Sequence, residues 1–191
     1  RPSGSSGILV SHIDGFKDYQ INKAWTWEHQ ALIKARPISG DGKMADRFEQ
    51  IRNAVLVQPR AKTKLREEVV GMRERMRREL LRPETGLFDL KQDAGGIVDI
   101  EFLVQYLVLL NSREYRGLLR WTDTVRLLET LNETDIIDDY IAHILKAAYL
   151  TYRATVHQLN LQEEPAKVSG NRFRGLRKNV DEIWKNIMEA V

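Results

Sequence analysis

The chain has 191 residues, of which 42% are hydrophobic and 30% are charged, and its formal net charge at pH 7 is +3. A chain of this size can bury a core as one domain, and no apolar run approaches the roughly 20 residues that a membrane-spanning helix requires. The absence of cysteine excludes disulfide bonds and thiolate metal sites, and the four histidines lack the close spacing of zinc ligands. We therefore expect a soluble, cytoplasmic protein.

Apolar residues recur at helical spacing along the first half of the chain, which follows a Gly/Ser-rich lead. Pro37, Pro59 and Pro83 separate the periodic segments, as expected at helix ends. The expected helices are one that begins with Asp14 as its N-cap, one over residues 25–36, one with the apolar face Met44, Phe48, Ile51 and Val55, and one with the apolar face Leu65, Val69, Met72, Met76 and Leu80.

The second half repeats this pattern with longer helices. The expected helices are one from about Ile97 to Asn111, one capped by Thr122 or Asp123 and running through Leu131, a long one with the stripe Ile137, Ile141, Leu145, Ala148, Tyr152, Val156 and Leu159, and a terminal one around Leu176, Val180, Ile183, Trp184 and Ile187. No alternating strand pattern or fixed repeat is found. The sequence therefore predicts an all-α fold, an antiparallel helical bundle of six or more helices.

A glycine-punctuated turn precedes the strongly apolar helix, in the segment DLKQDAGGIVDIEFLVQ over residues 89–105. Gly95 and Gly96 lack a Cβ, so the backbone there can take a positive φ and let another group approach closely. Two interpretations remain open. The segment is either an ordinary turn and helix start, or a ligand-facing helix start with Lys91 as a phosphate partner.

Asp99 and Glu101 stand two residues apart in the same segment. On a helix, such residues point about 200° apart, so both side chains cannot easily hold one metal ion. Glu101 leans toward the apolar face, where it needs a polar partner or a water-filled cleft. Asp99 faces away from it. We expect no metal site here.

An arginine-rich segment follows the glutamates of residues 67–68, in an order that suits the dipole of a single helix. It forms either a solvated helix face or an anion-facing surface. No aromatic residues interleave with these arginines, which weakens the case for binding single-stranded nucleic acid. Trp25, Trp27 and Trp121 are expected to pack in the core or between helices.

Four motifs in order carry a family resemblance: AWTWEHQALIKAR at 24–36, MRERMRREL at 72–80, FDLKQDAGGIVDIEFLVQYLVL at 88–109 and RWTDTVRLLETL at 120–131. They resemble the C-terminal half of bacterial glutamine synthetase adenylyltransferase. In that family a nucleotidyltransferase domain precedes a helical domain. The resemblance implies an enzyme of nitrogen-metabolism regulation that transfers AMP from ATP to a tyrosine of glutamine synthetase and whose other half removes it by phosphorolysis.

The resemblance also implies a domain division. Residues 1–13 would be the end of the preceding nucleotidyltransferase domain, with a short remnant of its sheet, and residues 14–191 the helical domain. The aspartates that hold two magnesium ions in such enzymes would lie before Arg1. The isolated chain is therefore expected to be inactive and to require no cofactor, whereas the full-length enzyme would use ATP and Mg.

For the site, the resemblance implies that the glycine turn faces the nucleotide cleft. The residues expected to face nucleotide or phosphate are then Lys91, Gly95, Gly96, Asp99, Glu101 and Arg1, and no catalytic residue is expected in this chain. An alternative remains, in which the chain is an interaction module that binds glutamine synthetase or a PII-type signal protein. The resemblance does not support a nucleic-acid partner, and we expect none. Residues 171–191 are too generic to assign a role.

Overall fold

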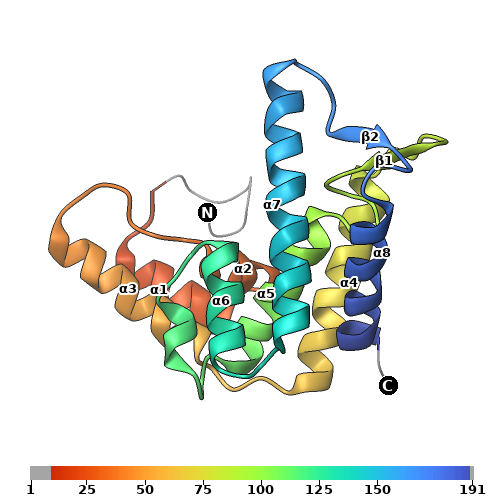
Figure 1. The fold of residues 1–191 in the computed structure, drawn as a ribbon. Coiled ribbons are helices and arrows are strands. Elements are labelled where there is room, and N and C mark those ends of the chain that lie inside the picture. The colour runs from red at the N-terminus through yellow and green to blue at the C-terminus, as the bar shows by residue number, and fades with distance from the viewer. Residues whose placement is uncertain (1–9, 190–191) are drawn as a thin grey trace.

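The computed structural model describes residues 10–189, and most of them are helical (Figure 1). Eight α-helices and two short helical turns of other types form this part of the chain. The α-helices are α1 (Ile13–Asn22), α2 (Thr26–Ile33), α3 (Gly42–Leu56), α4 (Lys62–Leu80), α5 (Ile97–Asn111), α6 (Thr124–Glu133), α7 (Asp139–Leu161) and α8 (Arg174–Trp184). The short turns are the 3-10 helix η2 (Arg116–Leu119) and the π-helix η3 (Lys185–Glu189).

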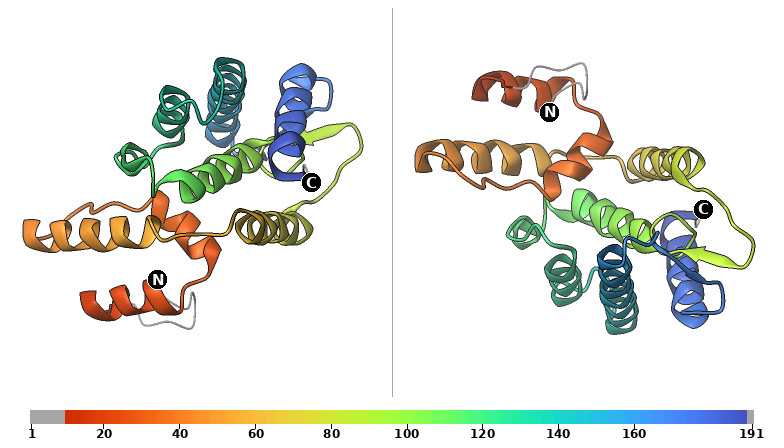
Figure 2. Two further views of the ribbon diagram at one scale, coloured as in Figure 1. Left: turned by 90° about the horizontal axis from the view of Figure 1, so that it is seen from below. Right: turned by 90° about the horizontal axis from the view of Figure 1, so that it is seen from above.

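Helix α5 is the centre of the fold. It packs against α2 and α4 and against α6, α7 and α8. Figure 2 shows it between α3 and α4 on one side and α6, α7 and α8 on the other. Its sequence explains this position, because apolar side chains cover nearly all of its circumference and such a helix is stable only when it is surrounded.

Two short strands lie beside the helices and were not expected from the sequence. β1 (Leu87–Asp89) pairs antiparallel with β2 (Lys167–Ser169), with Phe88 opposite Val168. Both of these central side chains are buried. A three-residue strand is too short to show an alternating pattern, so the sequence carried no signal for it.

The arrangement is not one antiparallel bundle. In Figure 1, α1 and α3 run across the direction shared by α4, α7 and α8. The expectation of at least six helices is confirmed, whereas the expectation of a single antiparallel bundle is wrong. The expected sheet remnant falls mostly on residues 1–9, outside the described part, and α1 begins at Ile13 without a strand before it in residues 10–12. The domain division at residues 13–14 stays a prediction.

Several helix ends match the sequence signals. Asp123 caps α6, since its side chain accepts a hydrogen bond from the Arg126 backbone N–H, and α5 has the expected bounds. The expected cap of α1 is wrong: His12 takes that place, and its Nδ1 accepts from the backbone N–H of Asp14. None of the helices in residues 10–189 is long and apolar enough to cross a membrane.

Candidate functional site

Two aspartate side chains fix the backbone of the loop between β1 and α5. The Asp89 carboxylate accepts hydrogen bonds from the backbone N–H groups of Lys91 and Gln92, each at 2.9 Å. Asp93 accepts one from the backbone N–H of Asp89, also at 2.9 Å. Lys91 is exposed on this loop, and its ammonium group contacts no acceptor within the described chain. The loop thus presents one free cation on a fixed backbone.

Gly95 and Gly96 are buried, and backbone atoms already occupy the space beside them. Gly95 has a φ of +77°, and a Cβ there would overlap the carbonyl oxygen of Arg177 in α8. At Gly96 a Cβ would lie 2.9 Å from the carbonyl oxygen of Leu90. In the described residues these glycines therefore let α8 and the loop backbone approach α5. Their contact with a ligand stays a prediction.

Asp99 is buried with 1% of its surface exposed, and it joins three parts of the chain. Its carboxylate accepts from Arg73 Nε at 2.6 Å, from an Arg77 Nη at 3.0 Å and from the Gly95 backbone N–H at 2.7 Å. Burial lowers the pKa of Arg73, and the facing carboxylate opposes that shift. Asp99 therefore fixes α4 and the glycine loop to the first turn of α5.

Glu101 points elsewhere, as the helical spacing predicted. It accepts from Lys34 Nζ at 2.6 Å and from the Tyr149 hydroxyl at 3.1 Å. These contacts connect the end of α2 with α7. The structure therefore brings Asp99 to the glycine turn but directs Glu101 away from it. Arg1 lies outside the described residues.

Arg73 and Arg77 were not singled out as partners of Asp99 by the sequence. A signal was present, because Leu65, Val69 and Arg73 recur every four residues and are the buried side chains of α4. The expected stripe was shifted instead toward Leu80, which is 51% exposed. Arginine inside a buried helix face indicates a paired carboxylate, and Asp99 supplies it. Three or more His, Asp or Glu residues that could hold a metal ion do not occur together in residues 10–189.

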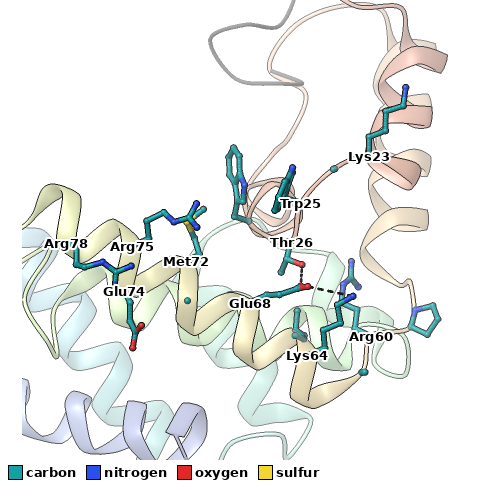
Figure 3. Close-up of a pocket in the computed structure, with 16 residues that line it drawn as sticks. Lys23, Trp25, Thr26, Arg60, Lys64, Glu68, Met72, Glu74, Arg75 and Arg78 are labelled. Atoms are coloured by element: carbon teal, nitrogen blue, oxygen red, sulfur yellow. Dashed lines mark hydrogen bonds and ion pairs between the residues drawn. The ribbon is translucent and has the colours of Figure 1, made fainter.

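A second feature is an open groove of about 1150 Å³ between the start of α2 and one face of α4. Figure 3 shows Trp25 and Thr26 on one side of it and Lys64, Arg75 and Arg78 along α4. We call it the tryptophan groove, because Trp25 and Trp27 line it and are 71% and 42% exposed. The expectation that these two indoles pack in the core or between helices is wrong. Trp121 does pack against the core, beneath the guanidinium of Arg120.

The wall of the tryptophan groove is ordered by hydrogen bonds. The backbone N–H of Trp25 donates to the Glu28 carboxylate at 3.0 Å, and Tyr19 donates its hydroxyl to the same carboxylate. Across the groove, the Thr26 hydroxyl donates to Glu68 of α4 (Figure 3). These hydrogen bonds fix the backbone from which the two exposed indoles extend.

Comparison with known proteins assigns the chain to a family. The model of glutamate-ammonia ligase adenylyltransferase matches residues 1–51, and the model of GlnD PII-uridylyltransferase matches residues 61–167, more than half of the chain. The chain belongs to the glutamine synthetase adenylyltransferase and PII-uridylyltransferase family. A curated relative is the bifunctional glutamine synthetase adenylyltransferase/adenylyl-removing enzyme of Methylococcus capsulatus, 48% identical over 190 residues.

That alignment covers 100% of this chain but 20% of the relative, so the chain spans about a fifth of the adenylyltransferase that it matches. The tryptophan groove takes Trp25 and Trp27 from the segment matched by the adenylyltransferase model and its α4 residues from the segment matched by the uridylyltransferase model. The glycine loop lies wholly in the second segment.

Proposed function

We propose that this chain is the helical part of an enzyme that transfers AMP from ATP to a tyrosine of glutamine synthetase. In the full-length protein the same enzyme would remove that AMP by phosphorolysis and so control nitrogen assimilation in the cytoplasm. The observation that carries the proposal is the 48% identity to a bifunctional adenylyltransferase, which extends over the whole chain. Both family matches support it.

In this proposal ATP and Mg bind mainly to a part of the enzyme outside these residues. The absence of a metal-holding cluster in residues 10–189 is consistent with that division. The helical part would close one side of the nucleotide cleft, and Lys91 would neutralise charge on the triphosphate. The fixed loop supports this role, because a cation held on an ordered backbone needs little reorganisation to meet a phosphate.

Asp99 would then act as a positioning residue. Its carboxylate is shared among Arg73, Arg77 and the backbone of Gly95, so it contributes by holding the loop and not by touching ATP. Arg1 and the two glycines stay as proposed phosphate-facing positions. Glu101, which contacts Lys34 and Tyr149, would keep α2 and α7 in place beside the cleft.

The second function, a module that binds glutamine synthetase or a PII-type signal protein, has one observation in its favour. The tryptophan groove exposes two indoles beside basic side chains, a composition typical of protein interfaces. Binding measurements distinguish the two functions. Loss of a contact in the tryptophan groove would weaken binding of the protein partner without weakening ATP binding.

The test uses the full-length enzyme that carries this chain, with radiolabelled ATP, magnesium and glutamine synthetase. We expect Lys91→Ala to slow labelling and to leave the thermal midpoint unchanged, because an exposed lysine contributes little to stability. Lys17→Ala, at an exposed lysine of α1, is the matched control. If Lys91→Ala labels glutamine synthetase at the wild-type rate, Lys91 does not act in the nucleotide cleft and this role is wrong.

The isolated 191-residue chain is the second arm of the same test. We expect it to leave glutamine synthetase unlabelled, because residues 10–189 contain no cluster of acidic or histidine side chains that could hold the two metal ions of adenylyl transfer. Label on the target tyrosine above a no-enzyme control would contradict this expectation.

A further inference from the structure

We propose that the tryptophan groove is an intramolecular docking site, in which another part of the same adenylyltransferase seats a carboxylate-rich surface against Trp25 and Trp27. This inference rests on the proposed function, since it takes the chain to be a piece of that longer enzyme. It goes beyond the proposed function, because it assigns a surface on which the helical part contacts another part of the enzyme. This contact forms whether or not a nucleotide is bound.

The first argument is the apolar surface. Trp25 and Trp27 are 71% and 42% exposed although the backbone N–H of Trp25 is fixed by the buried Glu28. Two large apolar rings are thus held in contact with water. A partner that covers them lowers the free energy, because apolar surface is removed from water. Tryptophan and arginine are also, with tyrosine, the residues most enriched at the positions that contribute most to binding in protein interfaces. Both types line this groove.

The second argument is Gly71, which lies in the middle of α4 and lines the groove. Glycine is one of the least favourable residues in a helix interior, so a packing reason is expected for it. Within the described chain, nothing lies within 4 Å of the position that its Cβ would take. The missing side chain therefore leaves space that no atom of residues 10–189 fills, which allows a partner to approach the backbone of α4.

The third argument is charge. Five basic residues and two acidic residues line the groove. Glu68 is already engaged by Thr26 and Lys64, and Figure 3 shows the Glu74 carboxylate pointing away from Trp25. In residues 10–189, Arg75 and Arg78 have no ion-pair partner. The matching surface must therefore carry carboxylates around an apolar contact.

The occupant follows from the size of the groove and from the relatives. The groove of about 1150 Å³ is open and exceeds the roughly 300–1,000 Å³ of pockets that enclose small ligands, so a protein surface fits it better than a nucleotide. The chain aligns over its full length with only 20% of a curated relative. Such an enzyme has four times as much chain elsewhere, covalently linked and hence at high effective concentration. An intramolecular occupant is thus favoured over a separate protein.

The experiment measures oxidative labelling of the indoles by mass spectrometry, in the full-length enzyme and in this chain alone. Trp184, which is 5% exposed, serves as the buried internal reference. We expect Trp25 and Trp27 to be labelled several-fold more slowly in the full-length enzyme, without ATP or any partner protein. Equal labelling rates in the two proteins would overturn the proposal.

Gly71→Gln separates docking from folding. In the isolated chain it should raise the melting temperature by about 1–2 °C, because glutamine is the better helix former. In the full-length enzyme the longer side chain should instead block docking. Both indoles should then be labelled at rates close to those in the isolated chain. Gly175→Gln in α8 is the matched control, since Gly175 also has open space beside it and lies outside the groove. Unchanged protection in Gly71→Gln would overturn the close approach.

Charge reversal is the third arm. Arg75→Glu combined with Arg78→Glu should also raise labelling of the two tryptophans in the full-length enzyme, whereas Arg113→Glu, an exposed arginine after α5, should not. Protection that appears only after glutamine synthetase, a PII-type protein or ATP is added would overturn an intramolecular seat. Protection of the indoles in an enzyme that labels no glutamine synthetase would refute the proposed function and leave the docking site standing.

Discussion

Arg73 and Asp99 form an ion pair at the contact of α4 with α5, with 2.6 Å between Nε and Oδ1 and with each side chain 1% exposed. Arg77 and the backbone N–H of Gly95 complete the contacts of the carboxylate. The same acidic side chain thus pairs with two arginines of α4 and with the backbone of the loop that precedes α5. Its burial makes the pair sensitive to the loss of either member.

Asp99→Asn should destabilise the chain by about 3–5 kcal/mol, the range for removing one partner of a buried pair. The reason is that Arg73 would remain buried without its counter-charge. Equilibrium unfolding in urea measures the change. Glu101→Gln is the control, because its partner Lys34 is 34% exposed and the pair should contribute at most about 1 kcal/mol. Equal losses in both variants would show that burial does not set the strength of these pairs.

Gly95→Ala should destabilise the chain more than Gly86→Ala. Both glycines have a positive φ, +77° and +79°, which costs an alanine about 1–2 kcal/mol. At Gly95 the added Cβ also overlaps the carbonyl oxygen of Arg177, whereas nothing lies within 4 Å at Gly86. Thermal midpoints of the two variants compare the steric part directly. Equal shifts of the two thermal midpoints would mean that α8 can move away from the loop without a loss of stability.

Helix positions could be predicted well where a periodic apolar stripe had clear ends. The bounds of α5 and the Asp123 cap of α6 follow from residues close in sequence. The opposite directions of Asp99 and Glu101 follow from helix geometry alone. These features depend on local spacing, which a single sequence contains.

Features that depend on distant partners could not be predicted. Arg52 and Arg73 are buried because they meet carbonyl groups or a carboxylate from other helices, and their own segments read as charged surface. Trp25 and Trp27 are exposed although their type favours burial. The contact between Gly95 and α8 joins residues 82 positions apart, so the loop could be recognised as special without its neighbour being known. Such pairings are set by tertiary packing, which spacing does not encode.

Leu145→Asp should unfold the chain or cost several kcal/mol, because Leu145 is fully buried on α7 and an unpaired carboxylate there has no partner. Leu161→Asp, at the end of the same helix, is the control, since Leu161 is 74% exposed. Circular dichroism during heating measures both. A variant at Leu145 that melts with the wild type would mean that this face of α7 is not in the core.

The pH dependence of stability should be set in part by His29, which lies on α2 with its ring buried. Burial lowers its pKa from the ordinary value of 6.5, and the nearby positive charge of Arg60 adds to that shift, while the carbonyl of Gln20 and the carboxylates of Glu28 and Glu68 oppose it. Arg60 donates to Nδ1 at 3.3 Å, so the proton of the neutral ring sits on Nε2 and donates to the Gln20 carbonyl at 2.9 Å. Protonating Nδ1 would break the contact with Arg60.

The unfolded chain therefore binds this proton more tightly than the folded chain, and stability should fall as pH decreases from above 6.5 toward the lowered pKa of the folded state. His29→Gln, which retains a donor for the Gln20 carbonyl, should make that fall less steep. His143→Gln, at an exposed position of α7, should leave the wild-type slope. Urea unfolding at a series of pH values from 7.5 to about 5 measures the three slopes. The same slope for His29→Gln and the wild type would show that the proton on His29 does not contribute to the acid sensitivity of the fold.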